Sequence, residues 1–158
     1  MNENVLQIAK TDNPDHLHLK LSGIINEEAQ LGFFKELPGG KKVVINTKEV
    51  ARINSCGVRE WILALKSVPQ GLEIVYEECS PAFMDQVNMI TNFASGGTIK
   101  SLYIPYVCGS CDKKSEELCD LEANMTADGL ELPEVKCPGC QNAMELADDP
   151  EQLFSFLG

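Results

Sequence analysis

Four of the seven cysteines in this 158-residue chain form two Cys-x-x-Cys pairs. Cys108 and Cys111 make the first pair, and Cys137 and Cys140 make the second, with 25 residues between the two pairs. Two intervening residues let one tight turn direct both sulfurs of a pair at the same ion, and zinc takes four thiolates in a tetrahedron. We therefore predict that these cysteines bind a structural zinc ion, the one cofactor that the sequence indicates.

The residues inside each pair suit such turns. Gly109 lies in the first pair, and Pro138 and Gly139 fill the second. Proline fixes φ directly after Cys137, and glycine has the backbone freedom that a tight turn needs. The same residues have an alternative interpretation as disulfides or as a working dithiol at Cys137 and Cys140. A thioredoxin-type dithiol stands at the start of a helix that follows a strand, whereas Pro138 and Gly139 suit a zinc-binding turn. A second, matching pair is also present, and both observations favour zinc.

Three cysteines remain outside the pairs. Cys56 precedes an apolar helix pattern, where the helix dipole can lower the pKa of a thiol and make it redox-sensitive; the alternative is a small packed residue. Cys79 stands before Ser80-Pro81 and is expected in the core or at a helix cap. Cys119 lies alone between the pairs and could act as a substitute ligand.

Composition and charge limit the possible partners. The first 25 residues contain no apolar run of signal-peptide length, and no stretch approaches the roughly 18 apolar residues of a membrane span. We therefore expect a cytoplasmic protein with no membrane partner. Residues 1–100 carry 10 basic and 12 acidic side chains, whereas residues 101–158 carry 3 and 12. Because phosphate binding needs clustered Lys and Arg, no nucleic-acid partner is expected.

The hydrophobic pattern predicts alternating strands and helices. Strands are expected at 4–9, 16–21, 42–46, 72–76, 99–107 and 130–135, and helices at 26–37, 57–66, 81–90 and 150–157, with a helix-and-loop insert at 112–129. This order predicts an α/β fold in which helices pack on a mixed sheet. We divide the chain into a domain at 1–104 and a small zinc-binding lobe at 105–158. The apolar residues of the last helix are expected to pack on the lobe or the sheet, or to bind a partner.

One segment of the first domain resembles a known family. Val43-Val44-Ile45-Asn46, the turn Ile53-Asn54-Ser55-Cys56-Gly57-Val58 and the helix that carries Trp61 and Leu65 resemble the STAS domain. The resemblance covers residues 4 to about 100. Members of this family include bacterial anti-sigma factor antagonists and the cytoplasmic domains of sulfate transporters. The resemblance implies a mixed sheet covered by helices, with a protein-docking turn before the helix.

The same resemblance assigns roles to single residues. Asn54 stands at the family's Asp, Ser55 at the first Ser, Cys56 at the Ser that a partner kinase phosphorylates, and Gly57 at the Gly. A thiol is a poor phosphoacceptor, so phosphorylation is not expected at position 56, although Ser55 could accept phosphate nearby. The resemblance implies that the partner is an anti-sigma factor, a kinase-like protein or another signalling protein. The partner-binding residues that we expect are Asn54, Ser55, Cys56, Gly57, Arg59 and Glu60.

Together these features favour a regulatory module over an enzyme. We expect a non-catalytic, cytoplasmic protein that docks on another protein and carries a structural zinc site, because four thiolates leave no open coordination position for water. The alternative is a thiol redox sensor or dithiol protein that uses Cys56 or the Cys-x-x-Cys pairs.

Overall fold

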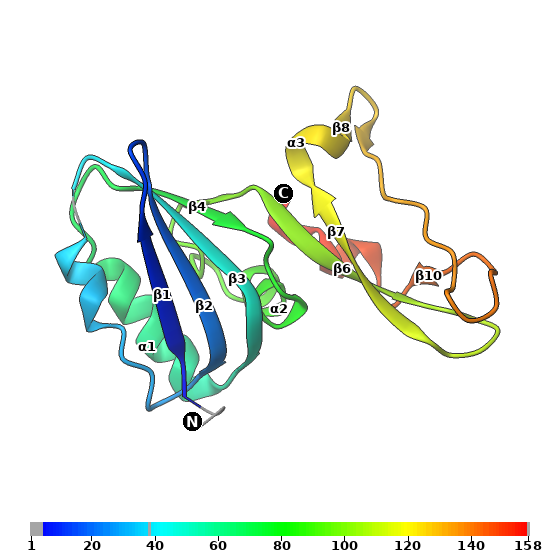
Figure 1. Cartoon of the computed structure of the whole chain (residues 1–158), viewed down its shortest axis with the longest axis horizontal. Helices are drawn as coiled ribbons and strands as arrows, with labels where there is room; N and C mark the ends of the chain where they lie inside the picture. The colour runs from blue at the N-terminus through cyan, green and yellow to red at the C-terminus, as the bar shows by residue number, and fades with distance from the viewer. Residues whose placement is uncertain (1–4, 38, 158) are drawn as a thin grey trace.

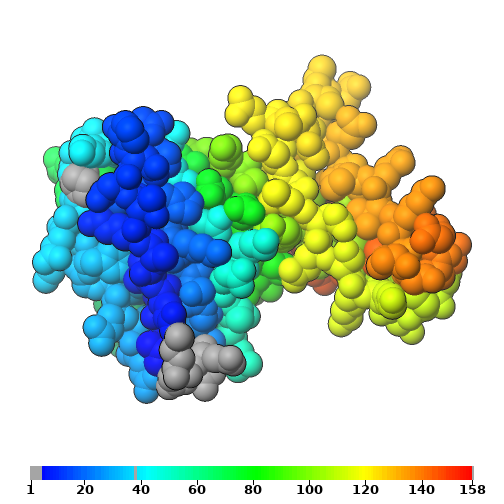
Figure 2. Space-filling view, viewed as in Figure 1, coloured from blue at the N-terminus to red at the C-terminus, as the bar shows by residue number. Residues whose placement is uncertain are grey.

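The computed structural model describes residues 5–37 and 39–157 as an α/β layer with a smaller lobe at one side. The lobe, coloured yellow to orange, projects from the blue-to-green layer (Figures 1 and 2). Both parts contain strands, but only the layer has long helices. The predicted combination of a mixed sheet, packed helices and a C-terminal cysteine cluster is confirmed.

The layer is built on a five-stranded sheet. Its strands follow chain order: β1 (Gln7–Asp12), β2 (Leu17–Ile25), β3 (Lys42–Ile53), β4 (Glu73–Glu77) and β5 (Thr98–Ile99). Strand β1 is antiparallel to β2, and the other neighbouring pairs are parallel. Leu19 pairs with Ile45, which pairs with Tyr76, so one face of the sheet carries a row of buried apolar side chains. That row is the reason this face must be covered.

Two helices and one short 3-10 helix cover the apolar face. They are α1 (Ser55–Lys66), α2 (Pro81–Met89) and the 3-10 helix η1 (Gly32–Glu36). Trp61 of α1 is fully buried, and its indole N–H donates to the Phe93 carbonyl oxygen at 3.0 Å. The rings of Phe34, Phe83 and Phe93 lie 5.5, 5.6 and 5.9 Å from the Trp61 ring. The layer therefore has a dense aromatic core at its centre.

Strand β6 (Ser101–Val107) joins the layer to the lobe. Within the lobe it is the middle strand of a three-stranded antiparallel sheet, between β10 (Glu145–Leu146) and β7 (Lys114–Asp120). On the layer side, Leu102 forms a parallel bridge with Cys79, and the Tyr103 N–H donates to the Cys79 carbonyl oxygen at 2.8 Å. The expected boundary between residues 104 and 105 thus falls inside one continuous strand, with no linker.

The rest of the lobe is short elements. After β7 come α3 (Leu121–Asn124) and a small hairpin of β8 (Met125–Thr126) and β9 (Gly129–Leu130). The chain ends in α4 (Pro150–Leu153) and the 3-10 helix η2 (Ser155–Leu157), which return to pack against α2. This apolar segment does pack inward, since Leu153, Phe154 and Phe156 lie against the core. Its main contacts are with α2 rather than with the lobe or the sheet as expected, and the helix expected at 150–157 is divided into α4 and η2.

Three sequence predictions are wrong in their details. Of the strand expected at 130–135, only Leu130 lies in a strand, β9, and residues 131–135 form neither helix nor strand. The helix expected at 26–37 is only the five-residue η1, because Gly32 interrupts the pattern and disfavours a continuous helix; Pro38, expected to end it, lies outside the described residues. The insert expected at 112–129 as helix and loop begins with strand β7, and its helix is only the four-residue α3. Its acidic sequence hid a strand that pairs with β6 on one side only and leaves several side chains exposed.

Candidate metal centre

The first cysteine pair sits in a tight turn directly after β6. The Asp112 N–H donates to the Cys108 carbonyl oxygen at 2.9 Å, and the Cys108 N–H donates to the Lys113 carbonyl oxygen at 2.8 Å. Asp112 adopts a left-handed conformation with φ of 61°, which closes the turn. We call residues 108–113 the first knuckle.

The second pair repeats this geometry. The Gln141 N–H donates to the Cys137 carbonyl oxygen at 2.9 Å, and the Cys137 N–H donates to the Asn142 carbonyl oxygen at 2.8 Å. Gln141 takes the left-handed role of Asp112, with φ of 66°. Residues 137–142 therefore form a second knuckle that matches the first position by position, and β10 follows it back onto β6.

The two knuckles bring all four thiols together. The sulfurs of Cys108 and Cys140 lie 3.4 Å apart, those of Cys111 and Cys137 lie 3.3 Å apart, and all four lie within 4.8 Å of one another. A tetrahedron with zinc–sulfur bonds of about 2.3 Å has sulfurs about 3.8 Å apart. The donor set and its spacing thus fit a tetrahedral thiolate-bound metal ion, and the predicted convergence of these residues is confirmed.

The surroundings favour deprotonation of the first cysteine of each knuckle. Backbone N–H groups of Cys111 and Ser110 lower the pKa of the Cys108 thiol. Burial acts to raise the pKa of Cys137, but the N–H groups of Cys140 and Gly139 outweigh it and lower that pKa to about 6. At Cys111 the N–H of Lys113 acts to lower the pKa, yet the neighbouring thiols raise it to about 12. A cation that stabilises all four thiolates would resolve this mutual repulsion.

Exposure differs between the ligands. Cys108 and Cys137 are buried, Cys140 is half-buried and Cys111 is exposed. The first cysteine of each knuckle therefore anchors the centre in the lobe, and the second faces outward. Four thiols saturate a tetrahedral ion, which is the arrangement of structural rather than catalytic zinc sites.

Neither Cys79 nor Cys119 belongs to the four-cysteine group that the described residues form. Cys79 is fully buried, and burial raises the pKa of its thiol to about 12, so its predicted place in the core is confirmed. Cys119 is also fully buried, on β7 opposite Leu102, and burial raises its pKa. Cys119 is therefore a buried packing residue of the lobe and not a fifth metal ligand.

The turn expected to bind a partner lies at the start of α1. Asn54 caps the helix by accepting from the Gly57 N–H at 2.7 Å, and its Nδ2 donates to Glu27 at 3.1 Å. Gly57 is buried, and a Cβ built there would clash with the Ile25 carbonyl oxygen. The other expected partner-binding residues are exposed: Asn54, Ser55, Cys56, Arg59 and Glu60. The interpretation of Cys56 as a small packed residue is therefore wrong. Gly57 is thus a packing requirement rather than a contact surface.

Exposure continues along one stripe of α1. Cys56, Arg59, Glu60 and Leu63 follow helical spacing, and Leu63 leaves 51% of its surface exposed. This stripe belongs to the layer, whereas the knuckles lie at the far end of the lobe (Figure 1). The structure therefore separates the two predicted sites rather than bringing them together.

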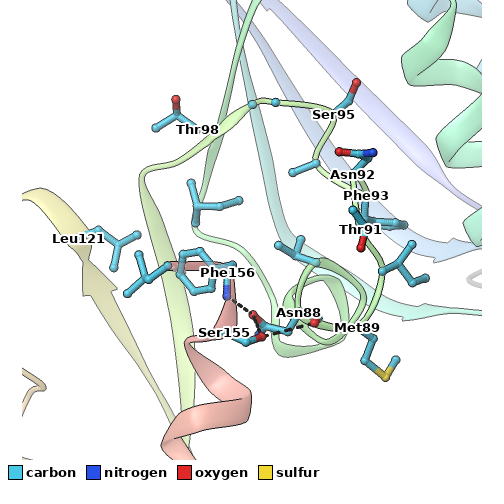
Figure 3. Close-up of a pocket in the computed structure, with 17 residues that line it drawn as sticks. Asn88, Met89, Thr91, Asn92, Phe93, Ser95, Thr98, Leu121, Ser155 and Phe156 are labelled. Atoms are coloured by element: carbon cyan, nitrogen blue, oxygen red, sulfur yellow. Dashed lines mark hydrogen bonds between the residues drawn. The ribbon is translucent and has the colours of Figure 1, made fainter.

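A hollow near the C-terminus was not predicted. It measures about 540 Å³ and is lined by residues 87–99, Leu121 and residues 155–157, none of them charged (Figure 3). Asn88 closes one side: its Nδ2 donates to the Leu153 carbonyl oxygen at 3.0 Å, and its Oδ1 accepts from the Phe156 N–H at 2.9 Å. No sequence motif marks Asn88, because its partners lie 65 and 68 residues away.

A polar network on the uncovered face of the sheet was also missed. Asn46 is buried, and its Nδ2 donates to Glu77 at 3.2 Å and to Glu78 at 2.6 Å. Tyr103 of β6 donates its hydroxyl to Glu78 at 3.3 Å, and Glu78 adopts φ of 46°. These contacts tie the start of the lobe to the layer. Two adjacent glutamates after an apolar strand were the only signal in the sequence.

No protein-family model matches the chain, and no curated protein matches it significantly. Within the described residues, no helix is both long enough and apolar enough to cross a membrane.

Proposed function

We propose that the chain is a non-catalytic, cytoplasmic regulatory module that docks on a signalling protein and carries a structural zinc ion. The observation that carries this proposal is the convergence of two matching knuckles, which place four thiols at tetrahedral spacing. Zinc is the ion proposed because it favours four-thiolate structural sites of this kind. When bound, it would cross-link the two knuckles; Cys108, Cys111, Cys137 and Cys140 would hold it.

Docking is assigned to the exposed start of α1. Asn54, through its cap, and Gly57, through its close approach to β2, hold the turn rigidly. Ser55, Cys56, Arg59 and Glu60 then stand on a firm, solvent-facing surface. A rigid, exposed turn loses little entropy on binding, which suits a docking site. The STAS-like resemblance supports this choice and makes an anti-sigma factor or kinase-like protein the proposed partner.

The thiol at position 56 sets the mode of regulation in this proposal. Cys56 is exposed at the position where the family carries its phosphorylated serine. Because a thiol does not serve as that phosphoacceptor, the module binds its partner without kinase control at this position. Negative charge introduced there should mimic the phosphorylated, released state.

A thiol redox function is the second candidate. The lowered pKa of Cys137, to about 6, would make it a reactive thiolate if no metal were bound. Elemental analysis of protein purified without chelators separates the two functions. One zinc per chain supports the structural centre, whereas metal-free protein that cycles between two thiols and a disulfide at 137 and 140 supports the redox function.

The docking surface has its own test. Cys56→Asp should weaken capture of the cellular partner, while Cys56→Ser, which changes little volume, should leave it nearly intact. Gln70→Glu is a matched control, because it adds the same charge at an exposed site beyond the opposite end of α1. If Cys56→Asp binds as well as Gln70→Glu does, the docking surface lies elsewhere.

A further inference from the structure

The sixth residue of each knuckle reaches across to the opposite knuckle. These are Lys113 in the first knuckle and Asn142 in the second, and each reaches the third residue of the opposite knuckle. The Asn142 Nδ2 donates to the Ser110 hydroxyl at 3.1 Å. On the equivalent side, a Cβ built on Gly139 would lie 3.0 Å from the Lys113 Nζ and 3.2 Å from its Cδ and Cε. The contact is reciprocal, but only the Lys113 side chain carries a charge.

The charged side chain, that of Lys113, lies beside the turn of the second knuckle. Four thiolates around a divalent ion have a net charge of about −2. The Gly139 N–H contacts the Cys137 thiol and lowers its pKa, and the Lys113 side chain lies over that same glycine. The ammonium group therefore stands next to the turn that presents one of the two buried ligands. Asn142 makes the equivalent contact, with Ser110, through an uncharged side chain.

We propose that Lys113 is a positioning residue of the metal centre, whose ammonium group crosses to the opposite knuckle, offsets the negative charge of the thiolates and holds the second turn closed. The proposal rests on the zinc centre described under Proposed function. It assigns retention of the ion to a residue that binds no metal, as outer-shell partners do in other metal sites.

Two consequences follow from the position of Lys113. Without its charge, less of the negative charge of the thiolates is offset, and the ion dissociates faster. Because Lys113 is exposed, salt screens part of this interaction, so the effect should shrink as ionic strength rises. A purely steric role would show no such dependence on salt.

The chain offers a matched pair of lysines for the test. Lys113→Gln and Lys114→Gln remove the same charge from adjacent exposed residues, but Lys114 begins β7 and pairs with Val107. The rate of zinc transfer to an excess of chromophoric chelator is measured for each at low and high salt. We expect about tenfold faster release from Lys113→Gln at low salt, a smaller difference at high salt, and release from Lys114→Gln at the wild-type rate.

A matched pair of glycines tests the contact itself. Gly139→Ala should displace the Lys113 side chain and speed release, whereas Gly109→Ala meets nothing within 4 Å and should not. Lys113→Arg should restore slow release. Equal release rates from zinc-loaded Lys113→Gln and Lys114→Gln overturn this inference and leave the zinc centre standing. Wild-type protein without zinc overturns both.

Discussion

The layer and the lobe are stabilised by different interactions. Five large side chains in the layer are fully buried: Phe34, Trp61, Tyr76, Phe83 and Phe93. In the lobe, by contrast, the buried apolar residues of the described chain are three of β6, three cysteines, Leu121 and Met144; those of β6 are Leu102, Ile104 and Tyr106. The layer buries enough apolar surface to fold through it, whereas the lobe contains too few large side chains for a core of its own.

The difference explains why the metal site lies where it does. Small domains that lack an apolar core commonly depend on a metal or on disulfides, and the knuckles lie at the end of the lobe that points away from the layer (Figure 1). Strand β6 and the Asn88 contacts then join two parts whose stabilities have separate origins. Removal of the metal from the lobe should therefore leave the layer folded, and loss of an aromatic side chain from the layer should leave the metal bound.

The largest effect is expected from loss of a metal ligand. Cys137→Ser should unfold the knuckles, since zinc contributes on the order of 10 kcal/mol to the folding of small zinc domains. Limited proteolysis should then cut within 108–146 and leave residues 5–100 intact. Cys119→Ser is the matched control, because it changes a buried cysteine of the lobe outside the cluster. Equal sensitivity of the two variants would contradict a metal-dependent lobe.

The reciprocal change should affect the layer. Trp61→Ala removes the centre of the aromatic cluster and the hydrogen bond to Phe93, and should cost about 3–5 kcal/mol of unfolding free energy. Urea denaturation followed by circular dichroism measures the loss. Zinc content under native conditions should stay at one ion per chain. A variant that folds but has lost its zinc would show that the lobe depends on the layer.

A smaller effect is expected where the two parts meet. Asn88→Ala removes the hydrogen bond to the Leu153 carbonyl oxygen. It also removes the bond from the Phe156 N–H, which Figure 3 draws. Because these groups can bind water instead, the cost should be about 1 kcal/mol. The main change should be faster proteolysis at 150–157, with zinc content and the melting of the layer nearly unchanged. Gln86→Ala, two residues earlier on α2, serves as the control.

The smallest effect concerns pH. Partial burial, and then the Asp148 carboxylate, raise the pKa of Asp85, so the folded protein binds this proton more tightly than the unfolded chain. Stability from this group therefore rises as pH falls through the raised folded-state pKa toward the unfolded value of about 3.9. Asp85→Asn should stabilise the protein at pH 7 by less than about 1 kcal/mol, because solvent screens the site. No gain at pH 7, or an equal gain at pH 3, would contradict this assignment.

Local patterns predicted the parts of the molecule that depend on local chemistry. The alternation of Leu17, Leu19 and Leu21 predicted β2, and the spacing of the four cysteines predicted the metal centre. Cap signals placed the starts of α2 and α4, where Ser80 and Asp149 accept backbone N–H groups. Each signal acts within a few residues of the structure that it specifies, or, for the cysteines, through the demand of one ion for four ligands.

Features that depend on distant partners could not be predicted in the same way. Strand β7 reads as a polar loop because only pairing with β6 makes it a strand. The contacts of Asn88 with the C-terminal segment, and of Asn46 with Glu78, join residues that no periodicity relates. Lys113 looked like one of three scattered basic residues, and only the folded knuckles place its side chain over Gly139.

Hydrogen exchange, measured peptide by peptide before and after removal of zinc with a chelator, tests the central claim most directly. The account predicts that amides at 108–146 lose their protection when the metal leaves, while those of β2, β3 and α1 exchange as before. Exchange that stays unchanged throughout the chain, or that accelerates equally in the layer and the lobe, would contradict a metal-supported lobe on an independently stable layer.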